Sequence, residues 1–265
     1  MDVSATHAEQ TVLLLGGTGR TGGRVLQQLL GRGVHVRAVV RSAERLPDGV
    51  VHDPRLTVVE ADLLSLSDGQ VEEQADGCDV VISCLGHTIS ARGVYGKPRD
   101  LVTRSVERVC RAIRELRPAQ PVRLILMSSV SVNRPGGLDT RRGQLEKAGL
   151  WTLRGLVPPA RDNQRAADFL HDVIEAANPQ VQWVAVRPDT LKEGEVTEYA
   201  LHEGLVDSLF RPGETNRANV AHYMCELATD GAVWETWRGR LPVIVDRAAA
   251  HQGGAAGLRP ASPPR

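Results

Sequence analysis

The stretch TVLLLGGTGRTGGRVLQQLL, Thr11 to Leu30, decides the fold. A short apolar run stops at Gly16, glycine recurs at Gly19 and Gly22, and an apolar pattern of helical period follows. A dinucleotide-binding loop requires this order of strand, glycine-rich turn and helix, because glycine lets backbone N–H groups approach a pyrophosphate at a helix N-terminus. The spacing predicts a nucleotide site. The alternative is a purely structural turn.

The rest of the chain continues the alternation of short apolar runs and helical patterns. Strands are expected over residues 12–15, 34–40, 56–60, 79–84, 122–127 and 181–186, and helices over 22–30, 101–117, 165–177 and 219–229. Asn219 is expected near the cap of the last helix. Six short strands separated by helices predict an α/β fold with a doubly wound parallel sheet (Rossmann), in the strand order 3-2-1-4-5-6.

The C-terminal part is expected to add a small substrate lobe to this sheet. The pattern loosens after Pro188, so residues 191–211 are predicted to form helices and loops, as a lobe or lid. The prediction is a single domain over residues 11–247, with its lobe mainly in 189–240 and an edge strand over 242–245. Trp234 and Trp237 are expected to pack in the core or lobe. Residues 1–10 are expected to be a flexible N-terminus, and the Ala/Gly/Pro-rich residues 248–265 a disordered tail.

Composition narrows the class of partner. The 32 basic and 32 acidic residues give a net charge of zero, which offers no support for nucleic acid or an anionic membrane. The four cysteines form no CxxC pair, so no metal site is expected. The chain starts without an export signal and has no apolar run near the ~18 residues of a membrane span. The expectation is a cytoplasmic monomer or homodimer acting on a small-molecule substrate.

The end of the second strand indicates which nucleotide binds. NAD sites usually carry an acidic residue there, whereas this chain has Arg41, with Arg37 inside the strand and Arg20 in the glycine loop. Guanidinium groups suit a 2′-phosphate, so NADPH is favoured and NADH stays possible. The alternative is that Arg41 is an ordinary exposed residue.

Further cofactor contacts are expected at the ends of the other strands. Asp62 either faces the adenine or caps the next helix. Gly86 would let the chain pass close to the cofactor, and Arg187 lies beside the nicotinamide or is structural. The full predicted set is Gly16, Thr18, Gly19, Arg20, Thr21, Gly22, Arg41, Asp62, Leu63, Cys84, Leu85, Gly86 and Arg187.

Six segments, taken together, resemble one known family. GGTGRTGG, VRAVVRS, EADL, VISCLG, LILMSSVSV and VAVRPDTL occur in the order seen in atypical short-chain dehydrogenase/reductases, in particular the NmrA-like, NAD(P)H-binding branch. The segment RANVAHYM resembles a C-terminal helix of that family. The resemblance implies the Rossmann fold and NAD(P)H. Its members include NADPH-dependent reductases, isoflavone-reductase-like enzymes, flavin and biliverdin reductases, and redox sensors without catalysis.

The chain lacks the Tyr-x-x-x-Lys dyad that most of the wider superfamily uses for proton transfer. Its tyrosines, Tyr95, Tyr199 and Tyr223, are followed four residues later by arginine, glutamate and leucine. By register, Gln164 or Arg165 falls near the usual lysine position of the helix PPARDNQRAADFLHDVI. Another proton source is therefore required if the chain is a reductase.

Candidate catalytic groups follow from position. Ser129, and then Ser128 and Ser131, end the fifth strand, where a hydroxyl could stabilise a substrate carbonyl or merely satisfy local backbone. His87 could shuttle a proton or be an ordinary loop histidine, and Tyr199 in the lobe could donate a proton or exclude water. Asn163 and Gln164 could orient substrate or nicotinamide, or form a polar helix start.

The hypothesis is an NADPH-dependent ketoreductase that reduces a carbonyl of a small, bulky aromatic or polyketide secondary metabolite. Its proton would come from water, from the substrate, or from a side chain other than the usual tyrosine. Arginine far outnumbers lysine, which suggests a high-GC genome and motivates the secondary-metabolite guess. One alternative is a non-catalytic NADP(H)-binding redox sensor, and another is an NAD(P)-dependent epimerase or dehydratase.

Overall fold

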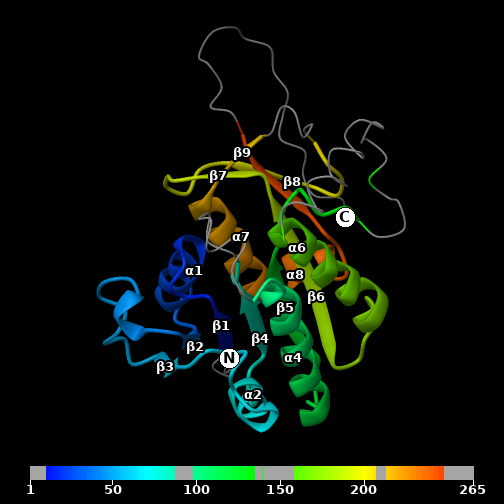
Figure 1. Cartoon of the computed structure of the whole chain (residues 1–265). Helices are drawn as coiled ribbons and strands as arrows, with labels where there is room; N and C mark the ends of the chain where they lie inside the picture. Colours follow the sequence, from blue (N-terminus) through cyan, green and yellow to red (C-terminus); the bar gives the residue numbers. More distant parts are fainter. Residues whose placement is uncertain (1–9, 87–97, 135–138, 140–157, 207–212, 248–265) are drawn as a thin grey trace, which may run out of the picture.

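The computed structural model describes residues 10–86, 98–134, 139, 158–206 and 213–247. Its centre is an eight-stranded sheet in the order β3-β2-β1-β4-β5-β6-β10-β8 (Figure 1). The strands are β1 (Thr11–Leu15), β2 (His35–Val40), β3 (Leu56–Glu60), β4 (Val80–Ser83), β5 (Val122–Met127), β6 (Val181–Pro188), β8 (Tyr199–His202) and β10 (Val243–Asp246). The predicted α/β fold and the order 3-2-1-4-5-6 are confirmed.

Helices cover both faces of the sheet, and each face has its own apolar core. One core joins the sheet to α1 (Arg20–Gly31), α7 (Arg217–Thr229) and α8 (Gly231–Trp237). The other joins it to α2 (Asp68–Ala75), α4 (Leu101–Leu116), α6 (Pro158–Phe169) and the π-helical turn η3 (Leu170–Ile174). Because both faces are covered, central strands such as β1 and β4 are continuous apolar runs rather than alternating ones. Trp234 is buried in the first core and Trp237 packs against it, as predicted.

The lobe differs from the prediction. Within residues 190–206 the structure has two strands, β7 (Thr190–Lys192) and β8, and no helix. β7 pairs with a further short strand, β9 (Glu214–Asn216). β10 is parallel to β6, and β8 runs antiparallel to β10 on its outer side. Residues 242–245 are therefore not an edge strand, because the lobe itself supplies the outermost strand of the large sheet.

Two helix boundaries also differ. α6 is already helical at Pro158, the first residue described in this segment, instead of starting at residue 165, and the helical segment ends at Ile174 in η3. α7 begins at Arg217 with Asn216 as its N-cap, so Asn219 lies inside the first turn. The Asn219 amide instead donates to Thr197 and Asp246 and ties the lobe to α7.

The remaining short element is the 3-10 turn η1 (Ala43–Arg45), which follows β2. The segments predicted as a flexible N-terminus, residues 1–10, and as a disordered tail, residues 248–265, fall almost entirely outside the described residues, as does His87. Within the described ranges, no helix has the length and apolar character to cross a bilayer.

Candidate functional site

The glycine loop between β1 and α1 is shaped by two glycines that packing requires. Gly16 has φ +82°, and a Cβ there would lie 2.8 Å from the Cys84 carbonyl carbon. A Cβ on Gly22 would overlap the Gly16 carbonyl oxygen. Gly19 differs, because it is exposed and a Cβ would meet only the Gly16 oxygen, at 3.2 Å. Gly16 and Gly22 thus allow the turn to pack closely against the end of β4, whereas Gly19 lies on the exposed side of the turn.

The N-terminus of α1 fits an anionic ligand. Its N-cap is Gly19, which provides no side-chain hydrogen bond, and its first turn contains no acidic residue. The first N–H groups of a helix have no partner within the helix and carry partial positive charge. Thr18, Gly19 and Arg20 are the accessible part of the loop, whereas Thr21 and Gly22 are buried. A pyrophosphate would therefore be held by residues 18–20.

Basic side chains lie beyond this loop. Arg41 is exposed at the end of β2. Arg45, which the sequence analysis missed, lines a groove of about 810 Å³ together with Thr18, Gly19 and Arg20. It lies in the short turn η1 after β2 and follows no motif that would mark it in the sequence. Arg37 is directed elsewhere, because its guanidinium donates to the backbone carbonyls of α2, including Gln74 at 2.6 Å.

The acidic residue after β3 does not cap a helix. The Asp62 carboxylate accepts the Leu64 N–H at 3.0 Å, while Ser67 caps α2 in a capping box with Gln70. The alternative that Asp62 caps the next helix is therefore wrong, and its role toward the adenine stays a prediction. Leu63 is buried and its carbonyl accepts a hydrogen bond from Arg108 at 2.7 Å.

At the next strand, Cys84 is buried against the glycine loop, while Leu85 is partly accessible and Gly86 is exposed. Burial raises the pKa of the Cys84 thiol above its usual range. Cys84 can therefore contribute packing and its peptide group to this site, but not a thiolate.

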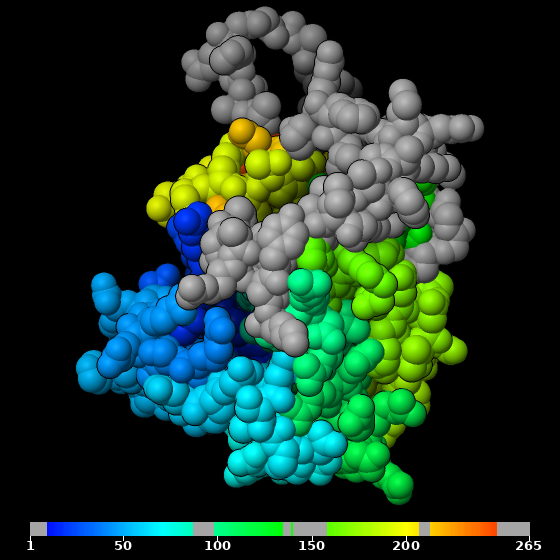
Figure 2. Space-filling view, viewed as in Figure 1, coloured from blue at the N-terminus to red at the C-terminus, as the bar shows by residue number. Residues whose placement is uncertain are grey.

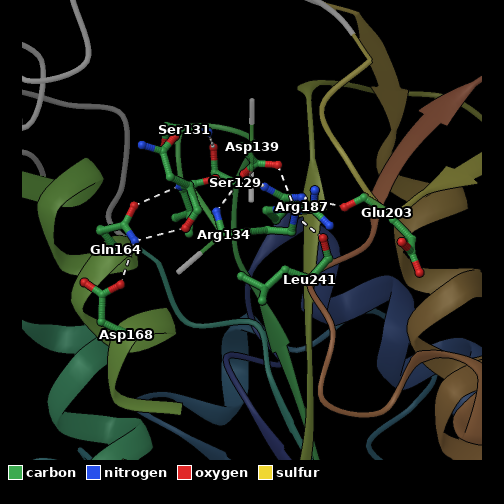
Figure 3. Close-up of polar contacts among 11 residues, drawn as sticks. Ser129, Ser131, Arg134, Asp139, Gln164, Asp168, Arg187, Glu203 and Leu241 are labelled. Carbon is green, nitrogen blue, oxygen red and sulfur yellow. Dashed lines mark hydrogen bonds and ion pairs between the residues drawn. The ribbon is translucent and has the colours of Figure 1, made fainter. Parts of the chain in front are cut away.

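The serines after β5 have distinct environments (Figure 3). The Ser131 N–H donates to the Ser129 hydroxyl at 3.2 Å, which is the local backbone role named as the alternative. The Ser128 N–H donates to the Val186 carbonyl, and its buried hydroxyl has no hydrogen-bond partner among the described residues. Ser128 is thus the serine with a buried hydroxyl that no described residue bonds, and the catalytic role of all three serines stays a prediction.

Arg187 lies at the centre of a buried polar cluster at the end of β6 (Figure 3). Its fully buried guanidinium donates to the carbonyls of Leu241, Val132 and Glu203 and pairs with Asp139 at 2.8 Å. These contacts support the structural alternative for Arg187, because it fastens three chain segments together. Cofactor contact by Arg187 stays a prediction.

Asp139, which the sequence analysis did not single out, completes this cluster. Burial opposes its ionisation, but hydrogen bonds from the Arg134 backbone and attraction to Arg187 outweigh that and lower the pKa of the Asp139 carboxyl. It also accepts from the Arg134 side chain at 2.9 Å. The buried ion pair between Asp139 and Arg187 thereby holds the loop after β5 against β6.

Two polar side chains of α6, the helix expected to carry the dyad, form hydrogen bonds to backbone groups of other segments. Asp162 on α6 is buried, and its carboxylate accepts the N–H groups of Val102 and Thr103 at 2.8 and 3.0 Å, so it caps α4 from a different helix. Gln164 bonds both backbone groups of Asn133, at 2.9 and 3.1 Å, and also Asp168. These bonds favour a positioning role for Gln164 over direct contact with substrate.

Tyr199 lies on the outermost strand, β8, and packs against the α1/α7 core. Its hydroxyl is 3.0 Å from His222 Nδ1, and burial, followed by repulsion from Glu226, raises the pKa of Tyr199 to about 12. A raised pKa makes the phenol a weaker acid, so Tyr199 is a poor general acid at neutral pH. Its predicted catalytic role is untested.

A second cavity, larger than the groove beside the glycine loop, lies at the other end of the sheet from the predicted site residues. It measures about 1020 Å³ and lies at the amino ends of the strands, where Gln10, Asp79, Val122 and Gln182 line it. It contains none of the predicted site residues. In doubly wound sheets, ligands bind at the carboxyl ends of the strands, where the glycine loop and the Ser128 hydroxyl are found.

Known proteins share this architecture. A short-chain dehydrogenase/reductase of Veillonella parvula, solved with NADP, superposes with a TM-score of 0.64 at 14% identity over 93% of this chain and 99% of that one. ChuY, an anaerobillin reductase of Escherichia coli O157:H7, gives 0.62 at 19% identity over 95% and 100%. A candidate NADH-flavin reductase of Streptococcus pneumoniae gives 0.60 at 18% identity over 90% and 100%.

Sequence comparison adds one relative and a family. An uncharacterised chloroplastic protein of Arabidopsis thaliana is 39% identical over 75 residues, which span 28% of this chain and only 27% of that protein. The model of the NAD(P)H-binding family matches residues 16–231, from the glycine loop through α7. The chain therefore belongs to the NAD(P)H-binding family.

Proposed function

We propose that the chain is an NADPH-dependent reductase of a bulky, conjugated carbonyl compound. The observation that carries this proposal is the uncapped N-terminus of α1 behind Gly19, with Arg45 lining the same groove and Arg41 exposed at the end of β2. The N–H groups at the start of α1 would hold the pyrophosphate, and the two guanidinium groups suit a 2′-phosphate. When bound, the dihydronicotinamide supplies a hydride, which is the two-electron half of the reduction.

The substrate class follows from the missing acid. No Tyr-x-x-x-Lys occurs in the chain, and Asp162 and Gln164 are bonded to backbone groups where the dyad would lie. The hydride would reach the carbonyl carbon, and the proton would reach the oxygen from water or from a hydroxyl of the substrate itself. The negative charge develops on the carbonyl oxygen and stays there, so a ketone with its own hydroxyl beside that oxygen needs the least help from an enzyme acid. Ser128 is the proposed hydrogen-bond donor to that oxygen.

The structural neighbours support a conjugated acceptor. Two of them are named for flavin and for anaerobillin, which are extended conjugated molecules. The secondary-metabolite origin of the substrate rests only on the arginine-rich composition of the chain.

Calorimetry and single-turnover kinetics test the proposal. NADPH is expected to bind more tightly than NADH, and Arg41→Ala is expected to reduce that preference, because it removes a guanidinium from the 2′-phosphate side. The NADPH complex is then mixed with a panel of aromatic ketones, quinones and free flavin. Oxidation of NADPH is expected and is measured as the loss of absorbance at 340 nm. Failure to bind either nucleotide would refute the assignment of the glycine loop.

A sensor without turnover is the second candidate, and the occupied α6 positions favour it. Tight NADPH binding with no oxidation by any acceptor of the panel would support this reading. An epimerase or dehydratase would instead turn over substrate with no net consumption of cofactor.

A further inference from the structure

A carboxylate from the lobe lies among arginines at the start of α1. Glu193, directly after β7, contacts Arg24 at 2.7 Å, Arg217 at 3.1 Å and Arg20 at 3.6 Å. Figure 2 shows the yellow lobe segment lying directly above the dark-blue segment that contains α1. The lobe thus places a negative charge beside the helix end that is expected to bind the pyrophosphate.

The three arginines are held to different degrees. Arg24 also donates to the Arg20 carbonyl, and the largely buried Arg217 donates to the Leu191 carbonyl. Arg20 has the longest contact to Glu193, and its side chain is 75% exposed. An exposed pair of this kind is weak, so Arg20 can leave Glu193 at little cost.

Arg20 is also the arginine closest to the nucleotide loop. It is the first residue of α1 and lines the groove together with Thr18 and Gly19. Its guanidinium therefore has two competing partners, the Glu193 carboxylate and a pyrophosphate at the helix N-terminus.

We propose that Glu193 sets the affinity for the dinucleotide by competing with its pyrophosphate for Arg20. This proposal rests on the proposed function, since it requires NADPH at the glycine loop. Glu193 is a positioning residue that opposes cofactor binding and anchors the lobe in its absence. Neutralising it strengthens binding, which is the opposite of what loss of a merely structural residue would do.

The experiment is calorimetric titration of NADPH into the wild-type chain, Glu193→Gln and the control Glu195→Gln. Glu195 lines the same groove, and no ion pair of its carboxylate occurs among the described residues, so the control removes the same charge without the arginine contact. Glu193→Gln is expected to bind NADPH about two- to five-fold more tightly, the range set by a weak exposed ion pair. Glu195→Gln is expected to give a clearly smaller change.

A double-mutant cycle with Arg20→Met tests the mechanism. The gain from Glu193→Gln is expected to vanish in the Arg20→Met background and with adenosine 2′-monophosphate, which lacks the pyrophosphate. Glu193→Asp, whose shorter side chain retracts from Arg20, is expected to give part of the gain and guards against a folding defect in Glu193→Gln.

The outcomes separate the two proposals. A wild-type chain that binds no NADPH overturns the proposed function itself. If the wild-type chain binds NADPH, three results would overturn the competition alone. They are a Glu193→Gln affinity equal to that of Glu195→Gln, a Glu193→Gln affinity below that of the wild type, and a gain from Glu193→Gln that persists in the Arg20→Met background.

Discussion

Asp162 on α6 accepts hydrogen bonds from both the backbone N–H and the hydroxyl of Thr103 on α4, at 3.0 and 2.6 Å. The carboxylate is buried and also accepts the Val102 N–H, so it satisfies two of the N–H groups that a helix start leaves open. Asp162 therefore links α6 to α4 on the helix where the resemblance leads one to expect the Tyr-x-x-x-Lys dyad. The same helix, α6, thus lacks the dyad and carries the carboxylate that caps α4.

Asp162→Ala is expected to destabilise the fold strongly. It removes three hydrogen bonds to a charged acceptor and leaves two buried N–H groups unsatisfied, which costs about 2–4 kcal/mol. Urea unfolding followed by circular dichroism measures the loss. Asp172→Asn, an exposed carboxylate nearby, is the control and should change stability by less than about 0.5 kcal/mol. A loss below about 1 kcal/mol for Asp162→Ala would show that the cap contributes little.

The glycine loop allows folding and binding to be separated. Gly19 has φ −82°, which any residue adopts, and a Cβ there would meet only the Gly16 carbonyl oxygen at 3.2 Å, a tight contact that a small shift relieves, so Gly19→Ala is expected to fold with a stability change of about 1 kcal/mol or less. The methyl group would project where the pyrophosphate approaches and is expected to weaken NADPH binding at least about tenfold, measured by calorimetry. Gly22→Ala is the contrasting variant, because its Cβ would overlap Gly16 and lower stability itself. Unchanged NADPH affinity in Gly19→Ala would place the pyrophosphate elsewhere.

These two predictions show what the sequence could and could not specify. The glycine spacing and the apolar runs act over one strand and one turn, so the loop and the strands were predictable from neighbouring residues, and the sheet order followed from the doubly wound class. The Asp162 cap joins residues about 60 positions apart, and Glu193 reaches α1 from a lobe after β6. Such contacts depend on how the elements pack and leave no local pattern. The lobe strand YALH was missed because four partly buried residues are too few to show a period of two.

Asp139 makes stability depend on pH. Its folded-state pKa lies below that of the unfolded chain, so the unfolded chain takes up the proton first as the pH falls. The contribution of Asp139 is therefore complete above the unfolded value of about 4 and is lost as the pH falls through the folded value. Asp139→Asn leaves the buried Arg187 without its counter-charge and is expected to cost about 3–5 kcal/mol at pH 7.

The measurement for Asp139 is urea unfolding of the wild type and Asp139→Asn between pH 7 and about pH 2.5. The difference between them should shrink as the pH falls below about 4, because the unfolded wild-type chain then binds a proton that the folded carboxylate does not. Asp76→Asn, which removes an exposed carboxylate, controls for net charge. A difference that stays constant with pH would mean that the Asp139 charge contributes nothing.

Ser128→Ala is expected to slow reduction without weakening the fold. The Ser128 hydroxyl is buried with no partner among the described residues, so its removal should be neutral for stability or slightly favourable. Loss of a donor to the substrate oxygen should lower the single-turnover rate about tenfold or more, with the NADPH affinity unchanged. Ser83→Ala removes a similarly unpartnered hydroxyl from the adjacent strand and serves as the matched control. Equal rates for the two variants would remove Ser128 from the mechanism.

Tyr199→Phe discriminates between a proton donor and a packing residue. The ring lies edge-on to His222 and its hydroxyl bonds Nδ1, so the variant should lose one partly buried hydrogen bond, about 1 kcal/mol. Since the pKa of Tyr199 is raised to about 12, the phenol has little tendency to give up its proton near neutral pH. The rate of hydride transfer to an aromatic ketone should stay within about twofold of wild type between pH 6 and pH 9. A general acid contributes about 10²–10⁴-fold, so a loss of that size would make Tyr199 the missing proton donor and place the lobe, rather than α6, at the reacting carbonyl.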